Sequence, residues 1–331
     1  VTCLSAHQEK MYHLGFHSPI RRSTLSEANE HRDWRIYRDF ATLLIAEARE
    51  RYARDKIPTL EIQEAAYVID STTIELCLPL FPWARLPHDL AAIKLHIGVE
   101  LHGNIPAFFN FSGGKTADVT FLDQIQFETG AYYMFDRGYL DFGRFFKIHE
   151  AGAFFVTRAK KHWSCRRLYS RPIDKSSGVR CDQIVVEGRH HHVKKYPEKM
   201  RRIKYYDALT KRYYVFVTNN FELSASMIAE LYKQRWQVEL FFKWVKQHLS
   251  IETFWGRSPN AVKTQICVAI STYLLVTILK KRLKIERNAY EILQILSVSL
   301  FDKMPIFTLI SQHPSQSTDD GAPKQAKLSG F

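Results

Sequence analysis

The sequence predicts an α/β protein with a mixed sheet flanked by helices. Two observations indicate this fold class: three successive segments have the period of a strand, and strand-like and helical segments alternate after them. With 331 residues, 46% of them hydrophobic, the chain can also bury a large core. The order of these elements from the amino terminus onward matters, because it decides which strands become neighbours.

Residues 1–60 are predicted to form a helical amino-terminal region. Ser23 and Thr24 precede Glu27 in the arrangement of a capping box, and the helical pattern DWRIYRDFATLLIAEARERY follows. The chain begins with Val1 in an ordinary polar segment, without the features of a signal peptide. We therefore expect this region to be truncated.

Residues 61–160 are predicted to form the first part of the sheet. Gly103-Asn104 joins two of its strands as a hairpin turn would. The predicted elements are the strands AAYVID (65–70), KLHIGVELH (94–102) and IPAFFNFSG (105–113), the helix FLDQIQFE (121–128), the strand AYYMFD (131–136), a helix over 141–150 and the strand AFFVTRAK (153–160). Three strands, helix, strand, helix, strand is the order of the ribonuclease H fold, which needs one more helix.

That last helix is predicted to follow an insertion. Residues 161–222 contain short alternating pieces such as QIVVEG and RYYVFVTNN, so we expect a β-rich basic insertion. A long helical pattern then runs from Ser224 to Leu249, within a predicted helical region 223–313. The tail 314–331 is rich in Ser, Asp, Gly, Pro and Lys, and this composition is typical of disorder.

The positive charge of the chain is concentrated in the predicted insertion. Residues 160–212 hold 16 Lys and Arg against five acids, a net charge of +11, whereas the whole chain has a net charge of +13. Aromatic residues are interleaved with these charges, which suits contact with phosphates and stacking on bases; they include Trp163, Tyr169, Tyr196, Tyr205 and Tyr206. The pattern favours nucleic acid as the partner, although a solvated basic surface has the same composition.

Cysteine usage and hydropathy exclude several classes of protein. The five cysteines are scattered and form no C-x-x-C pair, which argues against a disulfide framework or a zinc site and favours a reducing compartment. The most apolar run, residues 266–279, is too short to span a bilayer. We therefore expect a cytoplasmic protein with no membrane partner.

The predicted helix 224–249 carries one acid, Glu239, among basic residues. At 100° per residue, its polar positions fall within an arc of roughly 80°. These positions are Tyr232, Arg235, Glu239, Lys243 and Lys246. The stripe therefore predicts an organised polar face.

Two more acids occupy strand ends. Asp70 ends AAYVID, and Asp136 ends AYYMFD directly before Arg137-Gly138. In the ribonuclease H order, the first and fourth strands are neighbours and the last helix crosses their edge, so both acids are expected to meet Glu239. Three carboxylates suit two Mg²⁺ ions, which catalyse in-line displacement at phosphorus.

Each of these acids also has an ordinary explanation. An Asp at a strand end often shapes a turn, and a Glu among basic residues often forms an i,i+4 ion pair. Only their combination on the right elements favours a metal site. The tract His190 to His192 is interpreted as part of a basic loop, and Ser112 to Thr116 as a turn, because the latter lacks the P-loop spacing.

At these positions the sequence resembles the DDE transposases of the insertion sequence 4 family. Their signature Tyr-x2-Arg-x3-Glu-x6-Lys is met by Tyr232, Arg235, Glu239 and Lys246. Similar segments are VIDSTTIELCLPLFPWA, FDRGYLDF, FVTNNFELSA and FWGRSPNAVKTQI, and the resemblance runs from about residue 10 to residue 310.

The resemblance implies a cut-and-paste transposase of a bacterial insertion element, which cleaves and joins DNA at terminal inverted repeats. It implies that Asp70, Asp136 and Glu239 hold two Mg²⁺ ions, with Mn²⁺ as a substitute. It also implies DNA contacts by Tyr232, Arg235 and Lys246, to which we add the neighbouring Lys243 and Arg137. A homodimer in a synaptic complex with double-stranded DNA and a nucleoid-associated location follow from the same resemblance.

Some questions stay open from the sequence. Relatives hold a flipped base with an aromatic residue, for which Trp163, Tyr205 and Trp255 are candidates here. Family members have a longer amino-terminal region that recognises the repeats, so we expect chemical competence but not necessarily specific end binding. A ribonuclease H-like nuclease, or a non-catalytic truncated transposase that acts as an inhibitor, is an alternative function.

Overall fold

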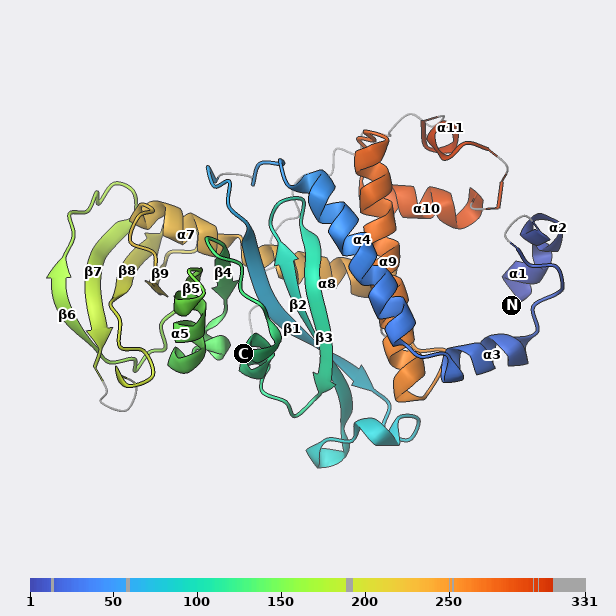
Figure 1. Cartoon of the computed structure of the whole chain (residues 1–331), viewed down its shortest axis with the longest axis horizontal. Helices are drawn as coiled ribbons and strands as arrows, with labels where there is room; N and C mark the ends of the chain where they lie inside the picture. The colour runs from blue at the N-terminus through green and yellow to red at the C-terminus, as the bar shows by residue number, and fades with distance from the viewer. Residues whose placement is uncertain are drawn as a thin grey trace. The chain divides into compact units, whose positions relative to one another are not determined.

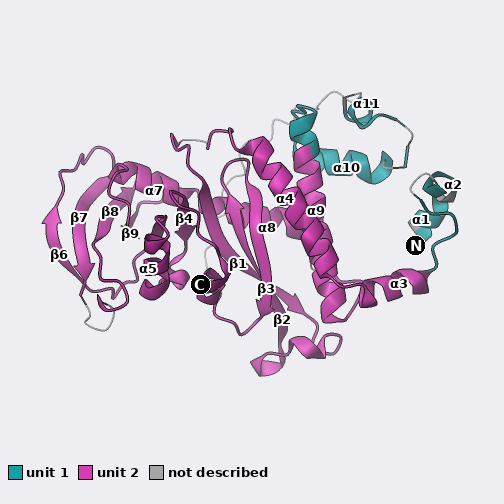
Figure 2. Cartoon of the chain, viewed as in Figure 1, with its two compact units in different colours: residues 1–21, 279–331 teal, residues 22–278 magenta. Residues whose placement is uncertain are grey.

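The computed structural model describes residues 1–12, 15–57, 60–188, 193–249, 251, 253–299, 301–302 and 304–311. The chain forms two compact units: residues 22–278, and residues 1–21 together with 279–331 (Figure 2). The predicted disordered tail 314–331 and the tract His190 to His192 lie outside the described residues.

A mixed sheet forms the centre of the larger unit (Figure 1). Within the described residues it has nine strands in the order β3-β2-β1-β4-β5-β9-β8-β7-β6. Neighbours β1 and β4, and β4 and β5, are parallel, and the other pairs are antiparallel. The strands are β1 (Ala66–Leu76), β2 (Ala91–Glu100), β3 (Ile105–Gly113), β4 (Tyr132–Phe135), β5 (Phe154–Arg158), β6 (Cys165–Ser170), β7 (Val179–Glu187), β8 (Met200–Asp207) and β9 (Arg212–Thr218).

Apolar side chains on both faces of this sheet are buried. Val68 belongs to a core with residues of α4, α7, α8 and α9, whereas Tyr67 and Ile69 belong to a second core with α5 and the 3-10 helix η4. Alternate residues of β1 therefore enter opposite cores. The helices are α3 (Arg22–His31), α4 (Arg35–Tyr52), η2 (Pro82–Ala84), η3 (Pro87–Asp89), η4 (Asp118–Gln124), η5 (Arg137–Tyr139), α5 (Phe142–Glu150), α7 (Ala225–Lys233), α8 (Trp236–His248) and α9 (Pro259–Arg282).

The smaller unit contains short helices from both ends of the chain. An ion pair of 2.6 Å joins the Lys10 ammonium to the Asp302 carboxylate within it. Both side chains are largely exposed, so this pair contributes little to stability. The helices are α1 (Thr2–Ala6), α2 (Gln8–Met11), α10 (Ala289–Ser299) and α11 (Ile306–Ser311).

The predicted hairpin between β2 and β3 is confirmed. The connection is the four residues 101–104, longer than a two-residue turn, and its last two residues, Gly103 and Asn104, have positive φ of 79° and 54°. A Cβ atom on Gly103 would also lie 2.2 Å from Cδ1 of Tyr52 on α4. Glycine is therefore needed here both for the backbone conformation and for the close approach of α4.

The segment 161–222, predicted as a β-rich insertion, is not separate from the core. Its strands β6 to β9 extend the central sheet, because β9 pairs with β5 from Val156↔Thr218 to Arg158↔Phe216. The sequence could not show this pairing, since it joins segments about 60 residues apart. The basic region and the predicted catalytic strands therefore share one sheet.

Three predicted local features are wrong. Residues 121–128 do not form an α-helix: the 3-10 helix η4 ends at Gln124, and without a side-chain cap such a short helix depends on tertiary packing. Ser23 and Thr24 lie inside α3 rather than capping it. The helix expected over 224–249 is divided into α7 and α8 at Gln234 and Arg235, where the backbone N–H of Arg235 donates to Tyr232 O at 3.0 Å in an i→i+3 bond.

Helix α9 contains a long apolar segment. It is longer than the run 266–279 that the sequence indicated, and by length and composition alone it could cross a membrane. Most of its apolar segment is buried inside the protein, with Val262, Ile266, Ile270 and Leu274 fully enclosed. Its hydropathy is therefore explained by its place in the core.

Candidate active site

The parallel pair β1 and β4 places two of the predicted acids side by side. Ile69 of β1 is in register with Phe135 of β4. The next residues along the two strands are Asp70 and Asp136. Asp70 lies inside β1, which continues to Leu76, and not at a strand end as predicted; it is the first residue beyond the pairing with β4. Because neighbouring strands lie about 4.8 Å apart, its carboxylate lies next to that of Asp136.

The backbone around Asp136 fixes the direction of its side chain. Asp136 caps the 3-10 helix η5, with its Oδ1 accepting a hydrogen bond of 2.5 Å from Gly138 N. A Cβ atom on Gly138 would lie 2.7 Å from that same oxygen, so a larger residue at position 138 would displace the Asp136 carboxylate. From β5, the Thr157 hydroxyl donates to Asp136 O at 3.2 Å. Asp136 thus shapes a turn, which is the ordinary explanation for an Asp at a strand end. Its other carboxylate oxygen, Oδ2, takes no part in the bond from Gly138 N.

Asp70 sits in an environment that disfavours its charged form. Burial is the main cause that raises the pKa of Asp70 to about 6, and repulsion from Asp136 and Glu239 adds to it. The hydrogen bond from Ser71 N, 2.8 Å, and the charge of Arg235 oppose this rise. The mutual repulsion also shows that the three acids lie close enough to interact.

The guanidinium of Arg235 lies between two of the acids. Its Nη2 is 2.5 Å from Glu239 Oε1, and its Nη1 is 3.3 Å from Asp70 Oδ2. The Arg235 side chain is only 18% exposed, so these contacts are poorly screened by water. Arg235 therefore supplies the positive charge that a cluster of carboxylates needs.

The remaining predicted residues lie on either side of the junction between α7 and α8. The predicted 80° arc assumed one continuous α-helix, whereas a 3-10 turn at Gln234 and Arg235 changes the angles between its members. Tyr232 is buried in α7, 7% exposed, where its ring lies 4.9 Å from that of Phe216. Lys243 is exposed on α8, and the Lys246 ammonium lies 3.4 Å from Thr73 O on β1. The DNA contacts of Tyr232, Lys243 and Lys246 stay predictions.

Burial also determines the chemistry of Tyr232. Loss of solvation raises the pKa of its hydroxyl, while the nearby guanidinium groups of Arg158 and Arg235 partly offset the rise. The Arg158 guanidinium lies 5.9 Å from the ring centre. Tyr232 therefore stays protonated, close to both Arg158 and Arg235.

The three acids suit a divalent cation in chemistry but are not arranged around one. Among the residues that the structure describes, no group of three His, Cys, Asp or Glu side chains is placed to hold a metal ion. Carboxylate oxygens are nevertheless the ligands that Mg²⁺ prefers. Burial, with added repulsion from Asp136 and Glu239, raises the pKa of Asp70, and a cation bound there would oppose that rise. The Arg235 side chain occupies the place between Asp70 and Glu239 in this structure.

A basic groove begins at Asp136. One hollow of about 390 Å³ is lined by Asp136, Arg137 and Gly138 together with Lys160 and Lys161. The two lysines also line a second hollow of about 390 Å³, which includes Leu140, Asp141, Phe142, His162, Trp163 and Lys195. The two hollows share Lys160 and Lys161 and therefore lie next to each other; together they are called the basic groove.

The cations of this groove lack acidic partners. Across the described ranges, no ion pair joins Arg137, Lys160, Lys161 or Lys195 to an acid, and all four side chains are exposed. Asp141, by contrast, caps α5 through Arg144 N, 3.1 Å. The groove therefore presents an excess of positive charge beside a carboxylate.

The three aromatic candidates for holding a base differ in exposure. Trp163 lines the groove, and its indole N–H donates to Glu187 Oε2 at 2.8 Å. Tyr205 is half-buried, with the Lys233 ammonium 5.5 Å from its ring centre. Trp255 is 86% exposed. Only Trp163 is placed beside the groove, so its position agrees best with a contact to nucleic acid.

Three lysines of the groove, Lys160, Lys161 and Lys195, were not predicted as site residues from the sequence. They contributed there only to the charge of the basic region. A signal existed for the first two: they follow β5, which is parallel to β4, so they leave the sheet at the same edge as Asp136. Nothing in the local sequence identifies Lys195, because tertiary folding alone brings it to the groove.

Comparison with known proteins identifies the family. The pattern of the Transposase DDE domain family matches residues 62–275, which include all three acids. The y4zB protein of Sinorhizobium fredii, named as a transposase, is 31% identical over 294 residues, covering 87% of this chain and 80% of its own. The chain belongs to the DDE transposase family.

Insertion sequences supply further relatives. The transposase named for insertion sequence element IS5377 of Geobacillus stearothermophilus is 30% identical over 274 residues, 80% of this chain and 69% of its own. The transposase named for element IS4SA of Synechocystis is 25% identical over 266 residues, 78% of this chain and 71% of its own. The predicted resemblance to DDE transposases of insertion sequences is confirmed at this level.

One solved structure is similar in part. A piggyBac transposase in a synaptic complex with hairpin DNA aligns with a TM-score of 0.46 and 10% sequence identity. The alignment covers 76% of this chain, which spans about half of that transposase, 55% of its length.

Proposed function

We propose that this chain catalyses cut-and-paste transposition of a bacterial insertion sequence, by cleavage and strand transfer at terminal inverted repeats. The observation that carries the proposal is the convergence of Asp70, Asp136 and Glu239: two adjacent parallel strands present the aspartates, and Arg235 joins Glu239 to Asp70. Membership of the DDE transposase family supports it. The assignment to the insertion sequence 4 family rests on the spacing of Tyr232, Arg235, Glu239 and Lys246.

The ribonuclease H-like fold is part of this proposal. The core order β3-β2-β1-β4-β5 supports it, because the first and fourth strands are neighbours as that fold requires. The segments 1–60, 61–160, 161–222, 223–313 and 314–331 are proposed as its functional regions. A cytoplasmic, nucleoid-associated location and a homodimer in the synaptic complex follow from the same function.

The proposed cofactor is a pair of Mg²⁺ ions, replaceable by Mn²⁺, held by Asp70, Asp136 and Glu239. Such ions, when bound, activate a water or a 3′ hydroxyl and neutralise charge on the phosphate. The chain's own groups do the rest. Arg235 neutralises Asp70 and Glu239, and the same group would also suit a DNA phosphate at the acids, since a guanidinium binds carboxylate and phosphate alike.

Double-stranded DNA is the proposed substrate, both as terminal repeats and as target. The groove from Asp136 to Trp163 is the proposed path of one strand, with Arg137, Lys160, Lys161 and Lys195 contacting its phosphates. Lys243 and Lys246 of α8 are proposed to contact the same DNA from the other side of Glu239. Phosphate contacts position the strand at the acids and carry no sequence information.

The deciding experiment is cleavage of a labelled duplex that carries the element's terminal repeat, with Mg²⁺ or Mn²⁺. Loss of a metal ligand in Glu239→Gln should lower the cleavage rate by more than about 100-fold, with DNA binding retained. The matched control is Glu230→Gln on α7, which removes a carboxylate that is paired with Lys233 at 3.0 Å and is not one of the three proposed ligands.

The outcomes separate the alternatives. Cleavage and joining that only Glu239→Gln abolishes supports the transposase. Cleavage by the wild type without joining to a target would instead favour a ribonuclease H-like nuclease. Binding without cleavage by the wild type would contradict the catalytic proposal and favour a truncated transposase that acts as an inhibitor.

A further inference from the structure

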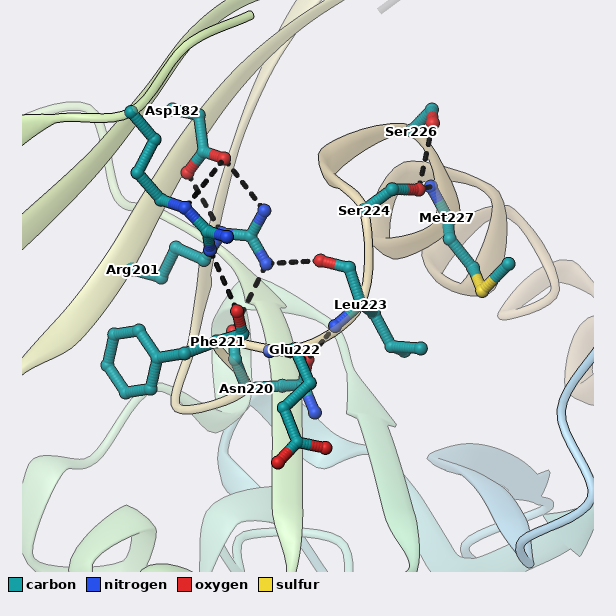
Figure 3. Close-up of polar contacts among 10 residues, drawn as sticks. Asp182, Arg201, Asn220, Phe221, Glu222, Leu223, Ser224, Ser226 and Met227 are labelled. Atoms are coloured by element: carbon teal, nitrogen blue, oxygen red, sulfur yellow. Dashed lines mark hydrogen bonds and ion pairs between the residues drawn. The ribbon is translucent and has the colours of Figure 1, made fainter.

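A buried ion pair connects the basic strands β7 and β8. Arg201 of β8 is 1% exposed and Asp182 of β7 is 4% exposed. Arg201 Nε donates to Asp182 Oδ1 at 2.8 Å and Nη2 donates to Oδ2 at 2.7 Å, which is a bidentate pair (Figure 3). Removing two charges from water is unfavourable unless their remaining hydrogen bonds are satisfied, so the other contacts of this arginine matter.

The third nitrogen of Arg201 binds the loop that leads into α7. Its Nη1 lies 2.5 Å from Leu223 O and 3.4 Å from Asn220 O (Figure 3). Arg171 adds a parallel contact, since its Nη1 donates to Phe221 O at 2.8 Å. Two arginines of the insertion therefore hold three neighbouring carbonyl groups of one loop.

The same loop is fixed from the core side. The Asn219 side chain accepts a hydrogen bond from Phe155 N and donates to Ala153 O, both at 2.8 Å, which joins it to β5. Asn220 Oδ1 accepts from Leu223 N at 2.8 Å, and Ser224 caps α7 by accepting from Met227 N at 3.1 Å. The start of α7 is thus held between the insertion and β5.

The segment of the chain after this loop carries two residues of the candidate active site. Helix α7 runs for nine residues, and Arg235 and Glu239 follow at the α7–α8 junction and on the first turn of α8. A helix of this length spans about 13 Å, so a small tilt at Ser224 is carried to the far end. The contacts of Arg201 therefore act on the part of the chain that brings Glu239 to Asp70.

We infer that Arg201, held by Asp182, is a positioning residue for the catalytic helix: the insertion sets the place of Arg235 and Glu239 as well as presenting basic charge. This inference rests on the proposed function of Glu239. Arg201 touches none of the three acids and acts only through the backbone of residues 220–223.

The test compares Arg201→Met with Arg201→Lys in the full chain. We expect the single-turnover cleavage rate on the terminal-repeat duplex to fall by about 10- to 100-fold in Arg201→Met, with the Kd for that duplex changed less than about 3-fold. Lysine restores the pair with Asp182 but cannot also reach Leu223 O, so Arg201→Lys should recover only part of the rate. The double variant Asp182→Leu, Arg201→Met should regain stability without regaining the rate.

The matched control is Arg49→Met, which breaks the pair between Arg49 of α4 and Glu100, 2.6 Å, on another part of the sheet. A merely structural role for Arg201 predicts equal losses of rate in the two variants at equal loss of stability. Equal losses, full recovery of the rate in the stabilised double variant, or an unchanged rate in folded Arg201→Met would overturn the inference.

Hydrogen exchange provides a readout that does not depend on DNA cleavage. In Arg201→Met we expect faster amide exchange in residues 224–239 and unchanged exchange in α4. Unchanged exchange in 224–239 would overturn the positioning inference even if the wild type cleaves DNA. If the wild type does not cleave, the proposed function fails separately, and the exchange result still decides whether Arg201 fixes α7.

Discussion

Asp70 lowers the stability of the folded chain at the position where the proposed function needs a carboxylate. Its neighbours Val68 and Ile69 are fully buried, so the strand carries the carboxyl into a partly dehydrated edge. Asp136 and Glu239 then add their repulsion. Residues at functional sites often reduce stability in this way, because their environment serves binding rather than folding.

The raised pKa of Asp70 predicts a pH-dependent stability of the metal-free chain. A carboxyl whose pKa rises on folding, here to about 6, favours the folded state below its unfolded pKa of about 4 and loses that contribution as pH rises to about 6. Asp70→Asn should therefore raise the free energy of unfolding at pH 7 to 8 by up to about 2 kcal/mol, and the Tm with it. The substitution should have little effect below pH 4. Thermal unfolding at several pH values checks this.

Metal addition provides the control for this prediction. Mg²⁺ at pH 7.5 should raise the Tm of the wild type, because a ligand that binds only the folded state stabilises it. The same addition should leave Asp70→Asn nearly unchanged. A loss of stability in Asp70→Asn at pH 7.5, in the absence of metal, would show that the aspartate is instead held favourably by Arg235.

At the scale of elements, the edge of the sheet explains why lysines after β5 reach the site. Strands β4 and β5 are parallel, with Tyr132 in register with Phe154, so the residues that follow both strands emerge together. Asp136 follows β4, and Lys160 and Lys161 follow β5. The basic groove is therefore a consequence of strand direction as well as of composition.

The double variant Lys160→Ala, Lys161→Ala tests the groove. We expect weaker DNA binding on all sequences and a shallower salt dependence, by about 0.9 in the slope of log K against log salt concentration for each phosphate that is no longer neutralised. Titration of a labelled duplex at several salt concentrations measures both. The control is the double variant Arg54→Ala, Lys56→Ala, which removes two exposed cations. They follow α4 shortly after Tyr52, which packs against Gly103 of the β2–β3 turn. An equal effect of the two pairs would show that DNA does not follow the groove.

At the scale of the larger unit, a polar network joins α4 to the sheet. Arg49 bonds Glu100 at 2.6 Å and Glu128 at 3.1 Å, and it also contacts the Tyr67 hydroxyl. Tyr67 in turn donates to Glu128 Oε2 at 2.7 Å. Glu100 is only 8% exposed in its side chain, so its charge depends on this arginine.

Arg49→Met should therefore destabilise the chain by about 2 to 3 kcal/mol, because it leaves the Glu100 carboxylate buried without its partner. Urea unfolding at pH 7.5 measures the loss. The companion variant Arg49→Met, Glu100→Leu should recover part of it, since two apolar side chains leave no unpaired charge. A loss below about 0.5 kcal/mol in Arg49→Met would mean that water or His102 satisfies Glu100.

Local patterns predicted much of this architecture because they report which side chains need burial. The strand alternation in β1 to β3, the Gly103-Asn104 turn and Asp136 before Arg137-Gly138 all have a physical cause within a few residues. The errors have causes outside the local sequence. The backbone breaks at Gln234 and Arg235 inside a continuous helical pattern, and Tyr232 is buried against Phe216, a residue of β9.

The sequence by itself determined the acids, the strands that carry two of them, and the excess of basic residues, because composition, spacing and period are local properties. Only the tertiary structure decided that β9 pairs with β5, that Arg235 lies between Asp70 and Glu239, and that Arg201 holds the loop before α7. Each of these contacts joins residues that are far apart in the sequence, or fixes a side-chain direction that the sequence does not show. Their free energy depends on burial and on the direction of neighbouring groups, which exist only in the folded chain.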